Sequence, residues 1–325
     1  MNGIRISAAI VVIFILGLRA APDAAAQSQQ SQQSPQSQQV RLNRSIETLE
    51  NGQPVFGLFT GNFSLANARA LARSGLDYIL IDMEHAPLDI ETLSTFLLGM
   101  TDKAAIARQG HAQMAVTPIV RIPVNGRNDP EWVVKQVLDM GVFGIMFPYI
   151  ETRAQAERAV RAMRYPQPRG SQLLEPVGLR GSSPGIASWY WGVSDYSQRA
   201  DLWPHNPRGE LLAVLQIESA EGVRNAEEIV TTPGVGAIFI GPADLALSMG
   251  LPGSSQEVQD AIDSVLALCV RHDVPCGITT NAGDVARRLA QGFRFPTVGY
   301  WGDAGIGGGV AEALRIARES AGRND

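Results

Sequence analysis

The stretch DPEWVVKQVLDMGVFGIMFPYIETRAQAERAVRAMR, residues 129–164, contains the repeating unit that decides the fold. Residues 129–141 and 152–164 carry apolar side chains at helical spacing, whereas residues 144–149 form a short apolar run between them. The first helical pattern stops at Gly141, a residue type favoured just past a helix C-terminus. The stretch therefore predicts a helix, a buried strand and a second helix in succession.

The same alternation continues along the chain from residue 55. The predicted strands are residues 55–60, 78–84, 117–122, 144–149, 211–218, 237–241, 274–279 and 295–300. Further helical patterns cover residues 64–75, 254–272 and 282–292. Apolar strands separated by helices predict a parallel sheet that is covered on both faces. Closed on itself, this sheet is a TIM-type (β/α)8 barrel of about 250 residues. A doubly wound open sheet is the alternative, but the segment after the first strand, LFTGNFS, lacks its G-x-G-x-x-G pattern.

Composition and charge fit a soluble enzyme. The 325 residues are 45% hydrophobic and carry a formal net charge of −5, which provides no basic surface for nucleic acid or anionic lipid. The two cysteines, Cys269 and Cys276, lie in apolar patterns where we expect them to be buried. A bridge between them stays open, because its formation depends on a Cα separation that the sequence does not give.

The N-terminus has a different character from the rest of the chain. A basic residue, a short apolar run and small residues within residues 1–26 predict a signal peptide. The apolar run is shorter than the roughly 20 residues of a membrane span, although an uncleaved anchor is the alternative. Residues 27–39, QSQQSQQSPQSQQ, are typical of a disordered linker. We therefore expect an exported protein, periplasmic or secreted, whose barrel domain covers residues 40–325 and is not inserted in a membrane after cleavage.

Ionisable and polar side chains gather where the predicted strands end. They are Asp82, Glu84, His85, Arg121, Gln216, Glu218 and Asp244. Barrel enzymes build their active sites at the carboxyl ends of the strands. Charges on buried strands must be paired, hydrated or bound to a metal, so this set predicts an active site.

Two of these acids suggest a chemistry. Glu218 and Asp244 follow neighbouring strands and could hold a hard divalent cation that chelates a 2-oxo acid and stabilises its enolate. Arg121 could place a second positive charge at the enolate oxygen, and His85 is the candidate base.

Each of these residues also has a simpler alternative role. Glu218 and Asp244, taken separately, could be helix caps or partners in surface ion pairs. Arg121 could be a salt-bridge partner of Asp82 or Glu84, and His85 a hydrogen-bonded core residue. The other histidines, for which we expect surface or loop roles, are His111, His205 and His272. The long connection at residues 165–209 could be a lid or an oligomer contact, and its Trp-Tyr-Trp cluster at residues 189–191 favours packing or a subunit contact.

Six motifs in order along the chain resemble the HpcH/HpaI aldolase/citrate lyase family. They are IDMEHAPLD (81–89), VRIP (120–123), KQVLDMG (135–141), RYP (164–166), LQIESAEGV (215–223) and FIGPADLALSMG (239–250). The resemblance covers about residues 50–315. Members of this family include 4-hydroxy-2-oxoheptanedioate aldolases and 2-keto-3-deoxy-sugar-acid aldolases. It implies metal-dependent cleavage of a 4-hydroxy-2-oxo acid to pyruvate and an aldehyde, with Mg²⁺, Mn²⁺ or Co²⁺. It also implies a homohexamer with a helix exchanged between subunits.

The resemblance also implies roles for single residues. His85 corresponds to the acid/base, Arg121 to the group that stabilises the enolate, and Glu218 and Asp244 to the metal ligands. Arg121 and Asp244 would also contact the substrate.

Four further positions follow from the same motifs. Gln216 and the backbone of Ala243 would hold pyruvate, Asp139 would raise the basicity of the histidine, and Asp82 would orient it. Met83 stands where the family often has glycine, which would narrow the space beside His85.

Two other functions stay open. The same site could decarboxylate oxaloacetate or cleave a CoA thioester, although CoA would need a basic groove and lysine is scarce in this chain. An exported 2-oxo-acid-binding protein without turnover is the alternative from another class.

Overall fold

The computed structural model describes residues 40–124, 129–300 and 305–323. The predicted signal peptide and linker, residues 1–39, lie outside the described residues. Eight strands are present: β1 (Gly57–Thr60), β2 (Tyr78–Asp82), β3 (Thr117–Arg121), β4 (Gly144–Phe147), β5 (Leu212–Ile217), β6 (Ala237–Ile240), β7 (Cys276–Ile278) and β8 (Thr297–Tyr300). Each lies inside one of the predicted apolar runs.

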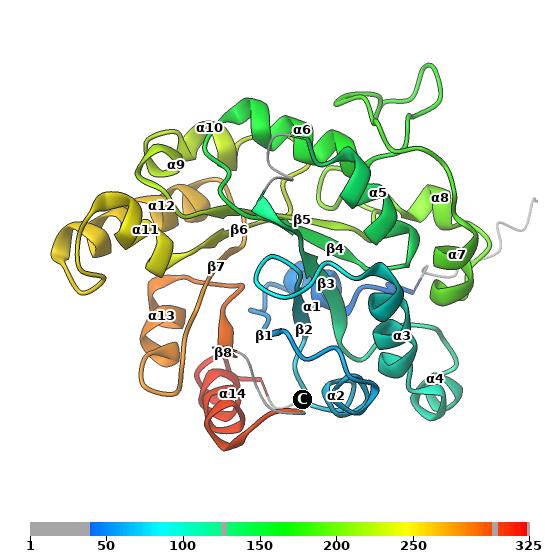
Figure 1. The fold of residues 1–325 in the computed structure, drawn as a ribbon, viewed down its shortest axis with the longest axis horizontal. Coiled ribbons are helices and arrows are strands. Elements are labelled where there is room, and N and C mark those ends of the chain that lie inside the picture. Colours follow the sequence, from blue (N-terminus) through cyan, green and yellow to red (C-terminus); the bar gives the residue numbers. More distant parts are fainter. Residues whose placement is uncertain (1–39, 125–128, 301–304, 324–325) are drawn as a thin grey trace, which may run out of the picture. The chain divides into compact units, whose positions relative to one another are not determined.

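The strands form one sheet in the order β7-β6-β5-β4-β3-β2-β1-β8. Every neighbouring pair is parallel. The two edge strands meet through a parallel bridge between Thr279 and Thr297, and the backbone N–H of Thr280 donates to the carbonyl of Thr297 at 2.9 Å. The sheet is therefore a nearly closed barrel with helices around it, which confirms the TIM-type prediction over the open sheet (Figure 1).

Fourteen helices accompany the strands in the described part of the chain. They are α1 (Arg44–Glu50), α2 (Leu65–Leu71), α3 (Ile90–Met100), α4 (Lys103–Gln109), α5 (Glu131–Asp139), α6 (Arg153–Met163), α7 (Gly185–Trp191), α8 (Tyr196–Arg199), α9 (Ala220–Arg224), α10 (Ala226–Val230), α11 (Pro242–Met249), α12 (Gln256–Arg271), α13 (Val285–Gln291) and α14 (Gly308–Ser320). Within the described ranges, no helix is long and apolar enough to span a membrane.

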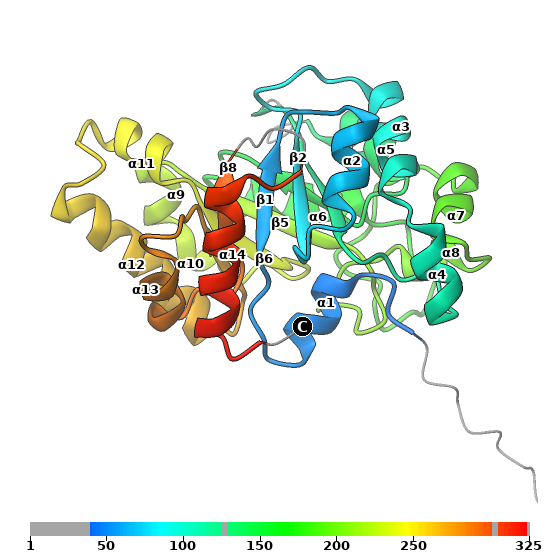
Figure 2. The same cartoon turned by 90° about the horizontal axis from the view of Figure 1, so that it is seen from below.

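The core has two layers, as expected when strands are covered on both sides. Inside the barrel, aromatic residues pack against one another, and the rings of Tyr78 and Phe295 stack with centroids 4.2 Å apart. Helix α1 lies across the amino ends of the strands and adds Ile46 and Leu49 to this inner layer (Figure 2). The outer layer lies between strands and helices and contains both cysteines, which are free and buried. The amino end of the barrel is therefore plugged.

The segment at residues 165–209 packs at the same amino end. The Trp191 ring stacks on Phe143 with centroids 4.3 Å apart, and its Nε1 donates to the carbonyl of Gly141 at 2.7 Å. The Tyr190 hydroxyl donates to the carbonyl of Leu97 at 3.1 Å, whereas Trp189 is 70% exposed. Packing is therefore the role of Tyr190 and Trp191. The interpretation of the segment as a lid is wrong for Tyr190 and Trp191, because both side chains are packed away from the carboxyl ends of the strands.

Candidate active site

The carboxyl ends of the strands surround a cavity of about 380 Å³. Its lining residues are Phe59, His85, Arg121, Gln216, Phe239, Gly241, Pro242, Ala243, Asp244 and Thr279. The side chains of Phe59 and Phe239 belong to the barrel interior, so the polar groups stand above an apolar floor. The structure thus brings residues of β1, β3, β5, β6 and α11 together with His85, which follows β2, and Thr279, which follows β7.

Asp82 is the structural anchor of one side of this cavity. Its carboxylate accepts two hydrogen bonds from Arg121, from Nε at 2.9 Å and from Nη2 at 2.6 Å. The same carboxylate accepts the backbone N–H groups of Glu84 at 3.1 Å and His85 at 3.4 Å. Asp82 therefore shapes the turn that carries His85, through its backbone and not through its ring.

Arg121 forms ion pairs with two acids at the edge of the cavity. It is a salt-bridge partner of Asp82, and its Nη1 also lies 3.1 Å from Oε2 of Glu84. Its guanidinium carbon lies 4.6 Å from the centroid of the Phe59 ring, and the side chain lines the cavity. This bidentate, buried geometry holds the positive charge at a fixed position at the edge of the cavity.

His85 faces the cavity and is not a core residue. Its side chain is 53% exposed, and Nε2 lies 3.6 Å from Oε2 of Glu84. Burial raises the pKa of Glu84, and the nearby charges of Arg121 and His85 only partly oppose this effect. His85 therefore combines access to the cavity with an acidic neighbour, which suits a group that exchanges protons.

Glu218 is the most constrained acid of the site. It is 1% exposed, its Oε1 accepts the backbone N–H of Tyr149 at 3.0 Å, and its Oε2 accepts a hydrogen bond from Nε2 of Gln216. Burial raises the pKa of Glu218 to about 8, and the charges of Glu84 and Asp244 act in the same direction. An ionised Glu218 is thus short of compensating positive charge.

Gly241 makes the position of Glu218 possible. A Cβ atom at residue 241 would collide with the Glu218 carboxylate and would lie 2.9 Å from Nε2 of Gln216. The Oε1 atom of Gln216 is buried and has no hydrogen-bond partner among the described residues. The site therefore holds an unused acceptor beside a carboxylate that lacks positive charge.

These groups suit a divalent cation with open coordination positions. Among residues 40–124, 129–300 and 305–323, no three His, Cys, Asp or Glu side chains form a set that could hold a metal ion. Glu218 and Asp244 are close enough for the charge of Asp244 to raise the pKa of Glu218. These two carboxylates could bind one cation and would leave its other coordination positions open. Oxygen ligands in such a set favour hard cations and leave positions for substrate and water.

Comparison with known proteins gives the family. A model described as HpcH/HpaI aldolase/citrate lyase matches residues 55–306. The chain belongs to this family.

Named relatives agree with that assignment. A hydroxypyruvate/pyruvate aldolase from Paraburkholderia phytofirmans is 36% identical over 251 residues, covering 76% of this chain and 87% of that protein. A 5-keto-4-deoxy-D-glucarate aldolase from Salmonella arizonae is 33% identical over 251 residues, covering 76% and 86%. The crystal structure of a HpcH/HpaI aldolase/citrate lyase family protein from Burkholderia cenocepacia is 34% identical, has a TM-score of 0.66, and covers 86% of this chain and 97% of that one. This HpcH/HpaI family member is therefore a carbon–carbon lyase that acts on small molecules.

Asp139 is the one predicted site residue that this family member does not bring to the cavity. It is the last residue of α5, and its Oδ1 accepts a hydrogen bond from Nη2 of Arg180 at 2.8 Å. Because α5 starts after the carboxyl end of β3 and ends before the amino end of β4, Asp139 lies at the opposite end of the barrel from His85. Met83 is also away from the cavity, because its side chain is buried in the outer core layer. It therefore does not narrow the space beside His85.

The structure adds residues that the sequence did not single out. Tyr149 lies two residues past β4, and its hydroxyl donates a hydrogen bond to Asp244. Burial, with the charge of Asp244, raises the pKa of Tyr149 to about 12, so the phenol stays protonated. Thr279, just past β7, also lines the cavity. Both are the last residues of predicted strands, 144–149 and 274–279, and this position is the signal in the sequence that could have pointed to them.

Proposed function

We propose that this aldolase reversibly cleaves a 4-hydroxy-2-oxo acid to pyruvate and an aldehyde, and that it uses Mg²⁺, Mn²⁺ or Co²⁺. The observation that carries the proposal is the surplus of buried negative charge around Glu218, next to the fixed guanidinium of Arg121. The relatives named as pyruvate and keto-deoxy-sugar-acid aldolases support a 2-oxo acid as substrate.

Glu218 and Asp244 are the residues that would hold the cation. Glu218 directly follows β5, Asp244 lies in the first turn of α11, and the charge of Asp244 acts on Glu218. When bound, a divalent cation supplies a Lewis acid that polarises the ketone oxygen of the 2-oxo acid.

Neutral groups of the cavity would hold the substrate carboxylate. Helix α11 begins at Pro242, and its N-cap Gly241 makes no side-chain capping hydrogen bond. The first backbone N–H groups of a helix lack partners within the helix and attract anions. Ala243, in this first turn, can therefore donate its backbone N–H to the substrate, beside the side chain of Gln216.

His85 and Arg121 would carry the proton and charge steps. The imidazole of His85 removes the proton of the C4 hydroxyl, and the C3–C4 bond breaks to release the aldehyde. The bonding electrons move into the C2–C3 bond, and the negative charge that develops on the C2 oxygen is stabilised by Arg121. A proton added to C3 then gives the methyl group of pyruvate, and the same steps in reverse form the bond.

Exchange of the pyruvate methyl protons tests this proposal without knowledge of the aldehyde. Pyruvate is incubated with the enzyme in D₂O, and the methyl signal is followed by proton NMR with and without added Mn²⁺. We expect exchange that stops when a chelator is added, resumes with Mn²⁺, and is lost in His85→Ala. A panel of aldehydes then identifies the acceptor.

The alternatives give different results in the same experiment. A binding protein without turnover would bind pyruvate and leave its methyl protons unchanged. A decarboxylase would release CO₂ from oxaloacetate and form no new bond with any aldehyde. Exchange that is unaffected by chelator would contradict the role of the cation.

A further inference from the structure

The backbone at Tyr149 has an unusual conformation. Tyr149 has φ 53°, in the left-handed region, although it is not a glycine. A side chain with a Cβ atom adopts this region at a cost, which the surrounding contacts must offset. The contacts of this loop therefore show what holds Tyr149 in place.

Three hydrogen bonds tie the loop after β4 to β5 and to the segment that follows it, up to the end of α9. The backbone N–H of Ile150 donates to the carbonyl of Gln216 at 3.0 Å. Glu151 accepts from the Ser219 hydroxyl at 2.8 Å, and its carbonyl accepts from Nδ2 of Asn225 at 2.7 Å. These bonds hold the loop that contains Tyr149 against the carboxyl end of β5, directly before Glu218.

Tyr149 contacts both carboxylates of the proposed cation site. Its backbone N–H donates to Oε1 of Glu218 at 3.0 Å, and its hydroxyl donates to Asp244. Glu218 is buried and is also bonded to Gln216, whereas Asp244 is partly exposed on the first turn of α11. Asp244 is therefore the carboxylate that is free to turn toward solvent, away from its like-charged neighbour.

We propose that Tyr149 is a positioning residue, which holds Asp244 beside Glu218 before the cation and the substrate enter. The Tyr149 hydroxyl, by its hydrogen bond to the Asp244 carboxylate, restrains the direction in which that side chain points. The left-handed backbone points the N–H group and the phenol of the same residue at two acids on different elements. The inference rests on the proposed function, because it assumes a cation between these two acids.

A simpler role for Tyr149 is space filling by its ring. The variant Tyr149→Phe separates the two roles, because it keeps the ring and the backbone N–H and removes only the hydroxyl. Removal of a group that orients a metal ligand typically costs about 10- to 100-fold in metal affinity or activity. We expect Tyr149→Phe to bind Mn²⁺ about 10-fold more weakly in the absence of substrate.

The measurement is a titration of Mn²⁺ followed by the EPR signal of the free ion. The matched control is Tyr165→Phe, because the Tyr165 hydroxyl is buried and has no partner among the described residues. This control should bind Mn²⁺ like the unchanged protein. In Tyr149→Phe we further expect the Mn²⁺ concentration for half-maximal exchange to rise more than the rate at saturating Mn²⁺ falls.

The possible failures can be told apart. If the unchanged protein binds Mn²⁺ and Tyr149→Phe binds it equally well, the positioning role is wrong and the cation site stands. If the unchanged protein binds no Mn²⁺ and its pyruvate exchange resists chelator, the proposed function fails and this inference falls with it.

Discussion

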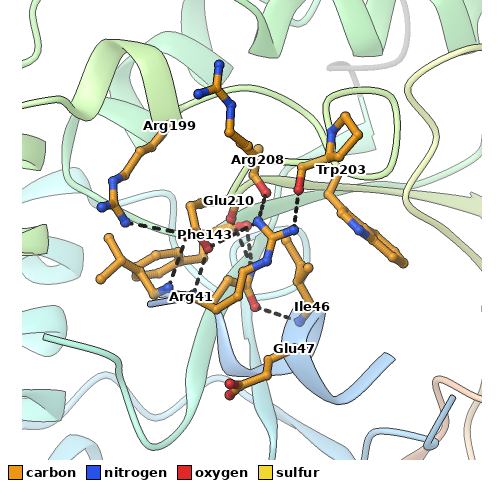
Figure 3. A network of polar contacts seen from close by, with 12 residues as sticks. Arg41, Ile46, Glu47, Phe143, Arg199, Trp203, Arg208 and Glu210 are labelled. Atoms are coloured by element: carbon orange, nitrogen blue, oxygen red, sulfur yellow. Dashed lines mark hydrogen bonds and ion pairs between the residues drawn. The ribbon is translucent and has the colours of Figure 1, made fainter. Parts of the chain in front are cut away.

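Both ends of the barrel contain buried carboxylates, but the charges that surround these carboxylates differ between the two ends. At the amino end, Glu210 accepts the backbone N–H groups of Leu42 at 3.1 Å and Asn43 at 3.0 Å (Figure 3). The guanidinium groups of Arg41 and Arg199 lie 4.0 and 3.7 Å from its oxygens. Each oxygen of this carboxylate therefore has both a backbone donor and a positive charge near it.

Two other acids at the amino end are matched in the same way. Asp77, just before β2, forms a bidentate pair with Arg323 at 2.7 and 2.8 Å. Asp201 pairs with Arg164, whose Nε lies 2.7 Å from Oδ1. Here the charges join segments that are far apart in the sequence, and their role is to hold the fold together.

The carboxyl end lacks this balance. Burial raises the pKa of both Glu210 and Glu218. At Glu210 the charges of Arg41 and Arg199 oppose this rise, whereas at Glu218 the charges of Glu84 and Asp244 add to it. Glu218 faces Glu84 and Asp244 instead of a guanidinium of its own. A protein retains such an arrangement where a ligand supplies the missing charge, so the contrast separates scaffold from site.

The largest effect should come from Glu218→Gln. This change keeps the shape of the side chain and removes the charge that the cation needs. We expect the rate of metal-dependent pyruvate proton exchange to fall by about 10³-fold, together with Mn²⁺ binding. The chain should still fold, because burial of a neutral amide costs less than burial of the Glu218 carboxylate. A variant that exchanges protons at the normal rate would remove the distinction between the two ends.

A smaller effect, on stability alone, should follow from Glu210→Ala. This change removes the acceptor of two buried backbone N–H groups, whereas Arg41 and Arg199 keep Glu50 and Asp195 as partners. We therefore expect the free energy of unfolding to fall by about 3 kcal/mol. Urea unfolding measures this loss, and the rate constant of exchange should not change. Glu157→Ala is the matched control, because Glu157 pairs with Arg153 on the surface and its removal should cost less than about 1 kcal/mol. Loss of exchange in a stably folded Glu210→Ala would show that the amino end also serves catalysis.

The barrel could be predicted from the sequence because the patterns that indicate its strands and helices each lie within a short stretch of the chain. Each strand is an apolar run, and the polar side chains of the site follow these runs directly, as with Asp82 and Glu218. The role of Gly241 depends on a distance to another strand, which no local pattern contains.

Two positions show where local signals end. Asp139 finds its partner, Arg180, in a long segment without periodicity, so its location could not be read from spacing. Tyr149 reaches the site because its backbone is left-handed, and the sequence FPY does not predict that conformation. Side chains that act through long-range pairing or unusual backbone geometry therefore need the structure.

The smallest expected effect is the pH dependence of the stability of Asp201→Asn, which also tests the difference in charge balance between the two ends. Burial of Asp201 favours the neutral form, but hydrogen bonds and charge from Arg164 outweigh it and lower the pKa of Asp201. The folded state therefore prefers the ionised acid, and its contribution to stability is complete above the unfolded pKa of about 4 and is lost as the pH falls through the lower folded value. Glu218 has the opposite shift, so acidification from its folded pKa of about 8 favours the folded metal-free protein at that end.

We expect Asp201→Asn to be less stable than the unchanged protein at pH 7 by about 1 kcal/mol, and this difference to shrink below pH 4. Urea midpoints at neutral and acidic pH measure the difference directly. A gap that stays constant into acid would mean that the Asp201 carboxylate, although paired with Arg164, adds nothing through its charge. The amino end would then owe its stability to hydrogen-bond geometry, and charge balance would no longer be what distinguishes it from the carboxyl end.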